Sequence, residues 1–178
     1  LKKAFPNINL DELNKITKLM WNNYGRVFAE YMFIKHFRKD ESNKNIKING
    51  KEILEDIKKK NKSVVFISGH LSNFELMAMH IEKSGIKLST IYRPLNNIFL
   101  NKIMERIRQK YICKYQIKKG IGGMKKLIHL KKLNYSSDLM IDQRVTQGIK
   151  SNFFSQIARR NKITAQHVKK FKLPAVHT

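Results

Sequence analysis

The sequence predicts an α/β fold in which a mainly parallel sheet carries helices on both faces, preceded by a long N-terminal helix. Short apolar, β-branched segments alternate along the chain with longer amphipathic ones, and this alternation is typical of layered folds with parallel strands. The segments predicted as strands are 63–68, 87–92, 138–141 and a fourth that begins at residue 174. The helices predicted between them cover residues 73–84, 96–111, 120–132 and 162–171.

The N-terminal segment predicts one long helix that runs to about Phe37. Asn9 can cap its start, and Glu12 stands where the second residue of a capping box belongs. Apolar residues then recur at helical spacing: Leu13, Ile16, Met20, Tyr24, Val27, Phe28 and Tyr31. We interpret this stripe as part of the hydrophobic core, with a membrane-facing patch as the alternative. A polar loop over residues 40–50 and a short basic helix over 52–60 should follow.

Charge is the unusual feature of the composition. The 178 residues suit a single domain, but 37 basic residues face 13 acidic ones, which gives a formal net charge of +24. Such an excess calls for an anionic partner, for example an anionic membrane surface or an acidic carrier protein. Nucleic acid is disfavoured, because no helix-turn-helix, zinc-finger or aromatic RNA-binding signature is present and arginine, the usual base reader, is scarce.

Cysteine usage and hydropathy narrow the possibilities further. Cys113 is the single cysteine, so an internal disulfide is impossible, and we interpret it as a small, partly buried side chain. Cys and His residues do not recur at metal-ligand spacing, so we predict no metal and no cofactor. No stretch approaches the roughly 18 uncharged apolar residues of a spanning helix. Residues 120–123 are rich in glycine but lack the spacing of a phosphate loop, so we read them as a turn into a helix.

The strongest chemical signal is a histidine directly after the first predicted strand. His70 follows Gly69, and Glu75 lies five positions further on. Residues five apart do not share a face of a helix, so we expect His70 in a turn and Glu75 in the first turn of the next helix. A carboxylate that fixes the tautomer of an imidazole makes it a better general base. The spacing alone also fits a turn histidine and a helix-start glutamate without any chemistry.

Two further polar residues follow strand ends. Arg93 comes after the second predicted strand and Asp142 after the third. Ligands of parallel α/β sheets bind at the carboxyl ends of the strands. We therefore expect His70, Arg93 and Asp142 to lie along one edge of the sheet.

Taken together and in order, these segments resemble the late acyltransferases of lipid A biosynthesis, the lauroyl/myristoyl transferase family of Gram-negative bacteria. Residues 69–75 are similar to the family's His-x4-Asp/Glu motif, residues 92–97 to its Tyr-Arg-Pro block, and Asp142-Gln143 to its Asp-Gln block. Two positions depart from the family pattern. Ile98 stands where proline is usual, and Ser155 follows two phenylalanines where glycine is usual.

The resemblance implies a glycerolipid-acyltransferase-like fold and O-acyl transfer at the cytoplasmic face of the inner membrane. The donor would be an acyl carrier protein thioester, and the acceptor a hydroxyl of a lipid A precursor. His70 would be the general base and Glu75 its orienting partner; no Ser or Cys nucleophile is needed, because the acceptor brings its own hydroxyl. The residues implied in substrate binding are Arg93, Asn97, Arg108, Asp142 and Gln143.

We also expect the chain to be part of a longer protein. Family members carry an N-terminal anchor and a long C-terminal part, whereas this sequence begins at Leu1 and ends in what looks like a new strand. Residues 1–178 would then form one partial catalytic domain whose fold is incomplete at the C-terminus. Three alternatives remain open: a related glycolipid or lysophospholipid acyltransferase, a basic nucleic-acid-binding domain, and a peripheral membrane-binding protein without catalysis.

Overall fold

A parallel sheet organises the molecule, as the sequence predicted, but it has five strands where four were expected. The computed structural model describes residues 1–178 except 40–45, 144, 146–147, 155 and 161–162, so Ser155 lies outside the described residues. The strand order is β3-β2-β4-β1-β7. The strands are β1 (Val65–Ser68), β2 (Leu88–Tyr92), β3 (Tyr115–Lys118), β4 (Ser136–Met140) and β7 (Ala175–His177).

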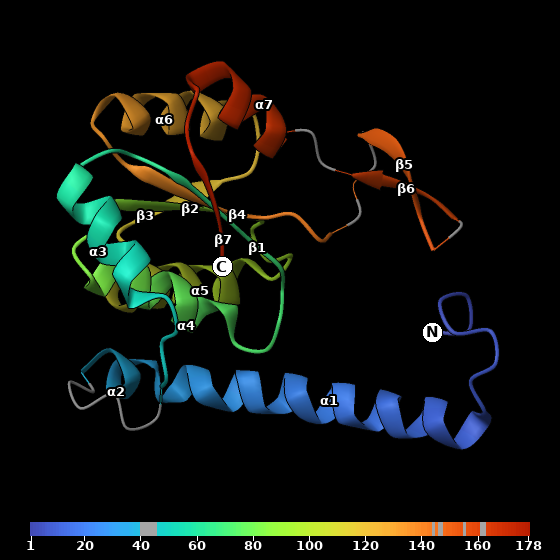
Figure 1. Ribbon diagram of the computed structural model, residues 1–178. Helices are drawn as coiled ribbons and strands as arrows, with labels where there is room; N and C mark the ends of the chain where they lie inside the picture. The colour runs from blue at the N-terminus through green and yellow to red at the C-terminus, as the bar shows by residue number, and fades with distance from the viewer. Residues whose placement is uncertain (40–45, 144, 146–147, 155, 161–162) are drawn as a thin grey trace.

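Helices cover both faces of this sheet (Figure 1). Below it in this view lie α3 (Lys51–Lys60), α4 (Phe74–Lys83) and α5 (Ile98–Tyr111). Above it lie α6 (Ile121–Lys132) and α7 (Ile163–Phe171). Each of these helices ends within two residues of the predicted boundary, because turn and capping residues mark the ends that periodicity leaves open.

The core is split by the sheet into two clusters. On the side of α4 and α5, the side chains of Phe66, Met79 and Leu88 are almost completely buried. On the side of α6, Ile117 packs with Leu127 and with Leu130. The run of apolar residues in β1 therefore fits a strand that is covered on both faces.

The long N-terminal helix is present, but its apolar stripe is not core. Helix α1 (Leu10–Met32) begins with the predicted cap, since the side chain of Asn9 accepts a hydrogen bond of 2.8 Å from the backbone amide of Glu12. None of the residues of α1, all of which the structure describes, is buried. The interpretation as core was wrong because helical periodicity identifies an apolar face without identifying what covers it.

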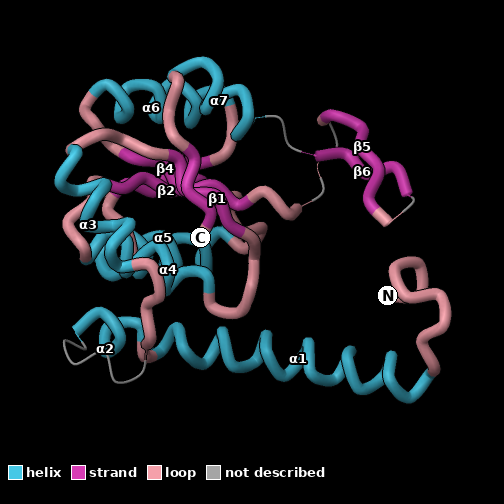
Figure 2. Tube along the Cα trace, viewed as in Figure 1, coloured by secondary structure: helices cyan, strands magenta, loops and turns pink. Residues whose placement is uncertain are grey.

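Helix α1 also ends earlier than predicted. Phe33 interrupts it, and a separate short helix, α2 (Ile34–Lys39), follows. Ile34 is buried and Phe37 packs against the larger core cluster, so the chain enters the core only after this break. Only the far end of α1 underlies α4 and α5, while its first half extends away from the sheet (Figure 2).

Three strands had no counterpart in the prediction. Strand β3 joins the edge of the sheet, and β5 (Ile149–Phe153) pairs antiparallel with β6 (Gln156–Arg160) in a separate hairpin. These segments are rich in Lys, Arg, Asn and Gln, so they lack the apolar runs on which the prediction depended. The hairpin lies apart from the sheet, on the side of the N-terminus, where the rings of Phe5 and Phe154 are 6.4 Å apart.

Candidate active site

His70 and Asp142 meet because they follow two neighbouring parallel strands. Strands β1 and β4 are paired so that Ser68 lies opposite Met140, and each of the two polar residues comes two positions after its strand end. The backbone amide of His70 donates a hydrogen bond of 2.8 Å to Oδ2 of Asp142. Both residues therefore stand at the carboxyl edge of the sheet, where ligands of such folds bind.

The carboxylate of Asp142 also fixes the imidazole of His70. Nδ1 lies 2.7 Å from Oδ1 of Asp142. A carboxylate can only accept, so Nδ1 carries the proton and Nε2 presents a lone pair. The side-chain amide of Gln143 lies 3.3 Å from Nε2 and can donate to it. This is the tautomer that a general base needs.

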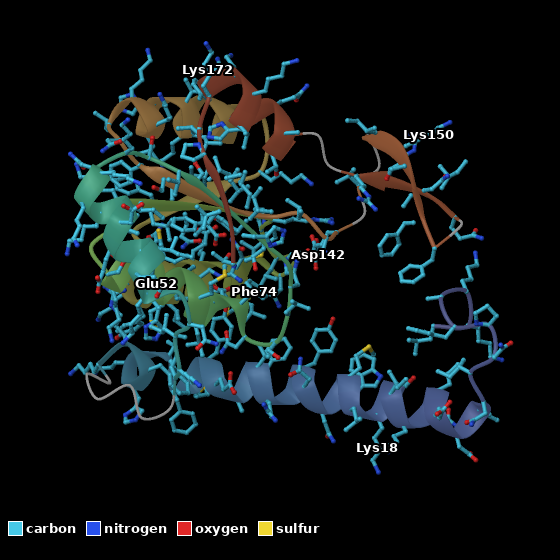
Figure 3. The ribbon with its side chains drawn as sticks, in the orientation of Figure 1. Lys18, Glu52, Phe74, Asp142, Lys150 and Lys172 are labelled. Carbon is cyan, nitrogen blue, oxygen red and sulfur yellow. The ribbon has the colours of Figure 1, made fainter. Side chains whose placement is uncertain are left out.

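The imidazole of His70 is packed on one side and accessible to solvent on the other. The ring of Phe74 meets it edge to face, with centroids 4.7 Å apart. The His70 side chain nevertheless remains 31% exposed, so a substrate can reach it. Figure 3 shows Asp142 and Phe74 close to this end of the sheet.

Ionisation of Asp142 is favoured by the same contacts. Partial burial raises the pKa of its carboxyl, but the hydrogen bonds from the backbone amide and the ring of His70 outweigh burial, and the net pKa is lowered. Asp142 is therefore a carboxylate at neutral pH, able to stabilise a positive charge on the imidazole.

Glu75 takes part in a different cluster. Its Oε1 accepts a hydrogen bond of 2.7 Å from Nε of Arg108, and Nη2 of Arg108 lies 2.5 Å away. The hydroxyl of Tyr31 donates to the same oxygen. The side chains of Glu75 and Arg108 are only 8% and 14% exposed, so this ion pair is largely removed from water.

The turn between His70 and α4 is tied to α1 as well. It contains one left-handed residue, Ser72, with a φ of 46°. The side chain of Asn73, at the cap position of α4, does not cap the helix but donates a hydrogen bond of 2.7 Å to Oε2 of Glu30. Residues 73 and 75 are thus both held by the end of α1.

A third group of polar contacts surrounds the turn after β2. Glu105 accepts hydrogen bonds from Tyr92 and, at 2.7 Å, from Asn101, and Lys118 lies 3.2 Å from it. The hydrogen bond from Tyr92 outweighs burial and, with the other donors, lowers the pKa of Glu105. The guanidinium of Arg108 lies 5.8 Å from the centre of the Tyr92 ring, which links this group to the Glu75 pair.

The family model described as bacterial lipid A biosynthesis acyltransferase matches residues 1–177. The chain belongs to this family. No curated protein matches the sequence. Membership makes the chain an enzyme that transfers acyl groups and confirms the relationship that the motifs indicated.

The structure of this lipid A acyltransferase brings together only some of the predicted site residues. His70, Asp142 and Gln143 form one contact group, and Glu75 with Arg108 forms another. The sequence predicted Glu75 as the partner of His70, but the carboxylate at hydrogen-bond distance from the imidazole is that of Asp142. Glu75 points instead toward α1 and α5, from which Tyr31 and Arg108 reach it.

The remaining predicted residues lie in the turn that follows β2. Arg93 is exposed, and Asn97 caps α5, where its side chain accepts a hydrogen bond of 3.0 Å from the backbone amide of Leu100. The sequence does not predict Tyr31 and Glu30 as site residues, because Tyr31 falls on the apolar stripe that predicts a core position. The only sequence signal for them is a carboxylate and a phenol hydroxyl beside the apolar face, near the end of the predicted helix.

Other features of this acyltransferase lie outside the site. Within the described ranges, no group of three or more His, Cys, Asp or Glu side chains is arranged to hold a metal ion. None of the helices described is both long and apolar enough to cross a membrane. Burial raises the pKa of the Cys113 thiol to about 12, which makes it an inert core residue.

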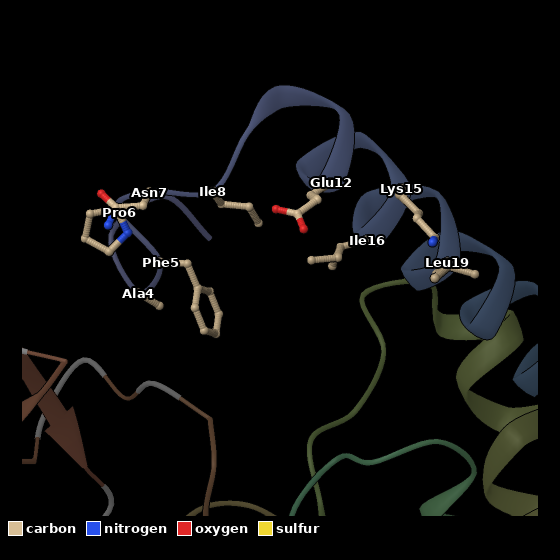
Figure 4. A pocket seen from close by; sticks show the side chains of 9 residues that line it. All are labelled: Ala4, Phe5, Pro6, Asn7, Ile8, Glu12, Lys15, Ile16 and Leu19. Carbon is tan, nitrogen blue, oxygen red and sulfur yellow. The ribbon is translucent and has the colours of Figure 1, made fainter.

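A cavity of about 690 Å³ lies between the N-terminal loop and the first half of α1 (Figure 4). Apolar side chains such as Phe5, Ile16 and Leu19 line it, with Glu12 and Lys15 beside them. None of its lining residues is a predicted site residue, whereas His70, Asp142 and Gln143 meet at the edge of the sheet.

Proposed function

We propose that this lipid A acyltransferase moves a fatty acyl chain from an acyl carrier protein thioester to a hydroxyl of a lipid A precursor, with His70 as general base. The observation that carries the proposal is the contact of 2.7 Å between His70 and Asp142 at the carboxyl edge of the sheet. Nothing else among the described contacts gives an exposed imidazole a fixed tautomer.

The transfer can be written with these groups alone. Nε2 of His70 takes the proton of the acceptor hydroxyl while its oxygen attacks the thioester carbonyl carbon. The tetrahedral intermediate then expels the thiolate, which takes the proton back from the imidazolium. An ester and a free thiol result, and Asp142 stabilises the imidazolium while it exists.

We assign the orienting role to Asp142 and a structural role to Glu75. Asp142 takes no part in the proton transfer, since its lowered pKa keeps the carboxylate charged. Glu75 has its Oε1 bound by Arg108 and Tyr31, so it serves the position of α4 rather than the imidazole directly.

The acceptor carries phosphate groups, and arginine suits them because its planar guanidinium binds phosphate in a bidentate manner. Arg93 is exposed at the same edge of the sheet, whereas Arg108 is engaged with Glu75. We therefore propose Arg93 as the phosphate contact and Asn97, which caps the next helix, as the residue that fixes the turn carrying it. Arg108 does not contact the acceptor in this proposal; it holds Glu75, at the start of α4, in place.

The charge of the chain supports the remaining partners. A net charge of +24 attracts an acidic carrier protein and an anionic membrane leaflet. Large apolar side chains are exposed on α1 and on α5, among them Trp21, Phe28 and Phe99. Apolar groups beside lysines are what an interfacial protein presents to lipid headgroups. We propose that the enzyme works at the cytoplasmic face of the inner membrane.

The test is acyl transfer by the full-length protein, from acyl carrier protein to a lipid A precursor. His70→Ala should lower kcat by about a hundred- to ten-thousand-fold, the usual contribution of a general base. His129→Ala is the matched control, because His129 is exposed on α6 and outside the site. A His70→Ala enzyme that keeps a third of the wild-type rate would rule His70 out.

A further inference from the structure

Tyr31 joins the long N-terminal helix to the buried ion pair below the active site. Its hydroxyl donates to Oε1 of Glu75, and Nη2 of Arg108 lies 3.2 Å from the hydroxyl oxygen. Arg108 in turn donates to the same carboxylate oxygen at 2.7 Å. The three side chains therefore form a closed ring of contacts from three different helices or helix ends: α1, α4 and α5.

The chemistry of a phenol suits this place. Burial, followed by the nearby Glu75 carboxylate, raises the pKa of Tyr31, so the hydroxyl stays protonated and donates. Its oxygen keeps lone pairs that can accept from Arg108. A phenylalanine would fill the same space but could neither donate nor accept.

The ring of contacts is next in sequence to Phe74, the residue whose side chain packs on the imidazole of His70. Glu75 follows Phe74, whose ring meets that of His70 at 4.7 Å. Asn73, on the other side of Phe74, is held by Glu30 at 2.7 Å. Two consecutive residues of α1, Glu30 and Tyr31, thus hold the residues on either side of Phe74 by hydrogen bonds.

We propose that Tyr31 is a positioning residue for acyl transfer: its hydroxyl fixes Glu75 and Arg108, and through Phe74 it keeps the imidazole of His70 directed at Asp142. The proposal rests on the proposed function, since it assumes that His70 is the base. Tyr31 itself touches no reacting atom.

The test compares Tyr31→Phe with Tyr24→Phe in the full-length protein. Both variants remove one hydroxyl from α1, but Tyr24 is 53% exposed and lies two turns earlier. For Tyr31→Phe we expect kcat to fall about tenfold with KM for both substrates within about twofold, because a slightly misdirected base slows the chemical step without weakening binding. For Tyr24→Phe we expect wild-type constants.

Two further measurements separate positioning from a general loss of stability. The Nδ1 proton of His70, bound to Asp142, should give a downfield proton resonance in the wild type and in Tyr24→Phe, and this signal should broaden or vanish in Tyr31→Phe. In a Glu75→Gln background, Tyr31→Phe should have almost no additional effect, because residues that act as a unit are not additive.

The outcomes distinguish the inference from the function on which it rests. Wild-type kcat together with an unchanged Nδ1 resonance in Tyr31→Phe would overturn the inference. A wild type without acyl transfer would overturn the proposed function. A His70 Nδ1 resonance that depends on Tyr31 would in that case still support the positioning role. Should Tyr31→Phe not fold, Glu75→Gln decides instead, because Tyr31 acts through Glu75: it should weaken the same resonance, and an unchanged resonance and rate would overturn the proposal.

Discussion

Nδ1 of His70 lies 2.7 Å from Oδ1 of Asp142, although the two residues are 72 positions apart in the sequence. The contact exists because β1 and β4 are neighbours in a parallel sheet, and the two segments that follow these strands leave the sheet in register. Asp142 is thereby bound twice, by the ring and by the backbone amide of His70. The imidazole of such a doubly fixed pair needs no movement of its own, and the acceptor hydroxyl takes the place of the Gln143 amide, 3.3 Å from Nε2.

Asp142→Asn should lower kcat by about a hundred- to ten-thousand-fold, because an amide group can turn its NH₂ toward Nδ1 and favour the wrong tautomer. Steady-state acyl transfer measures this. In a His70→Ala background the same change should cost almost nothing more, since the two residues act together. Asp56→Asn, at an exposed pair with Lys60, is the control. Near-wild-type turnover by Asp142→Asn would show that another group orients the imidazole.

Glu75→Ala should destabilise the fold by about 3–5 kcal/mol, because it leaves the Arg108 guanidinium buried without its partner. Urea unfolding measures the change. The exposed pair of Lys60 with Asp56 is the comparison, and Asp56→Ala should cost no more than about 1 kcal/mol. Replacing both Glu75 and Arg108 by leucine should recover much of the stability. If Glu75→Ala unfolds like the wild type, the pair is not structural.

Asp138 should make stability fall as pH rises. It is buried in β4, and burial, followed by the nearby Glu75, raises the pKa of its carboxyl to about 7. The folded protein thus keeps a proton that the unfolded chain loses near pH 4, and the free energy of unfolding decreases between about pH 4 and pH 7. Oδ1 of Asp138 and Oγ1 of Thr90, directly across on β2, have no hydrogen-bond partner among the described residues.

Asp138→Asn should therefore stabilise the protein at pH 8 by up to about 4 kcal/mol, since each pKa unit corresponds to about 1.4 kcal/mol. Its amide carries no charge at either end of the pH range, like the protonated acid, so the variant avoids the cost of burying a carboxylate. At pH 4 the variant and the wild type should unfold alike. Urea unfolding at both pH values is the measurement, and an equal effect at the two would mean that Asp138 does not titrate in this range.

The elements could be predicted from sequence more fully than the site. Apolar runs and turn residues located β1, β2, β4 and the helices between them, because those signals are local. The partner of His70 was missed for the opposite reason. Glu75 is near in sequence, whereas Asp142 comes from another strand, and its contact depends on strand order, which no local pattern contains.

The role of α1 was missed for a related reason. Its periodicity was correctly recognised, but a hydrophobic face can meet a core, a lipid or a partner, and the sequence does not say which. Tyr31 illustrates this, since it belongs to the predicted stripe yet uses its hydroxyl in a polar cluster. The hairpin of β5 and β6 carries too many polar and charged residues to show the apolar alternation of a strand.

Gly123 should be essential to the packing of α6 on β3. A Cβ at this position would lie 1.9 Å from the backbone oxygen of Lys118, so Gly123→Ala must move the helix or the strand. We expect a loss of about 1–3 kcal/mol, typical of overpacking. Gly122, the preceding residue, has nothing within 4 Å of its Cβ position, so Gly122→Ala should instead gain about 0.5–1 kcal/mol from helix propensity. Thermal unfolding of both variants should give shifts of opposite sign.

The exposed face of α1 should bind lipid. Trp21 and Phe28 are each 66% exposed and Met32 is 83% exposed; their spacing of seven and four residues places them on one face of the helix. Burying such a side chain contributes about 1.5–3 kcal/mol, so Trp21→Ser and Phe28→Ser should each weaken binding to anionic vesicles about tenfold or more. Sedimentation with vesicles of phosphatidylethanolamine and phosphatidylglycerol measures this on residues 1–178.

Neither change should lower the melting temperature, because neither side chain is part of the core. Ile53→Ser, at a 48% exposed position on α3, is the control and should bind as the wild type does. Raising the salt concentration should weaken all of them through the lysines, but the tenfold difference between Trp21→Ser and the wild type should persist, because salt screens charge and not apolar contact. Equal binding by all three variants would mean that charge alone holds the protein at the membrane and that this face of α1 serves another partner.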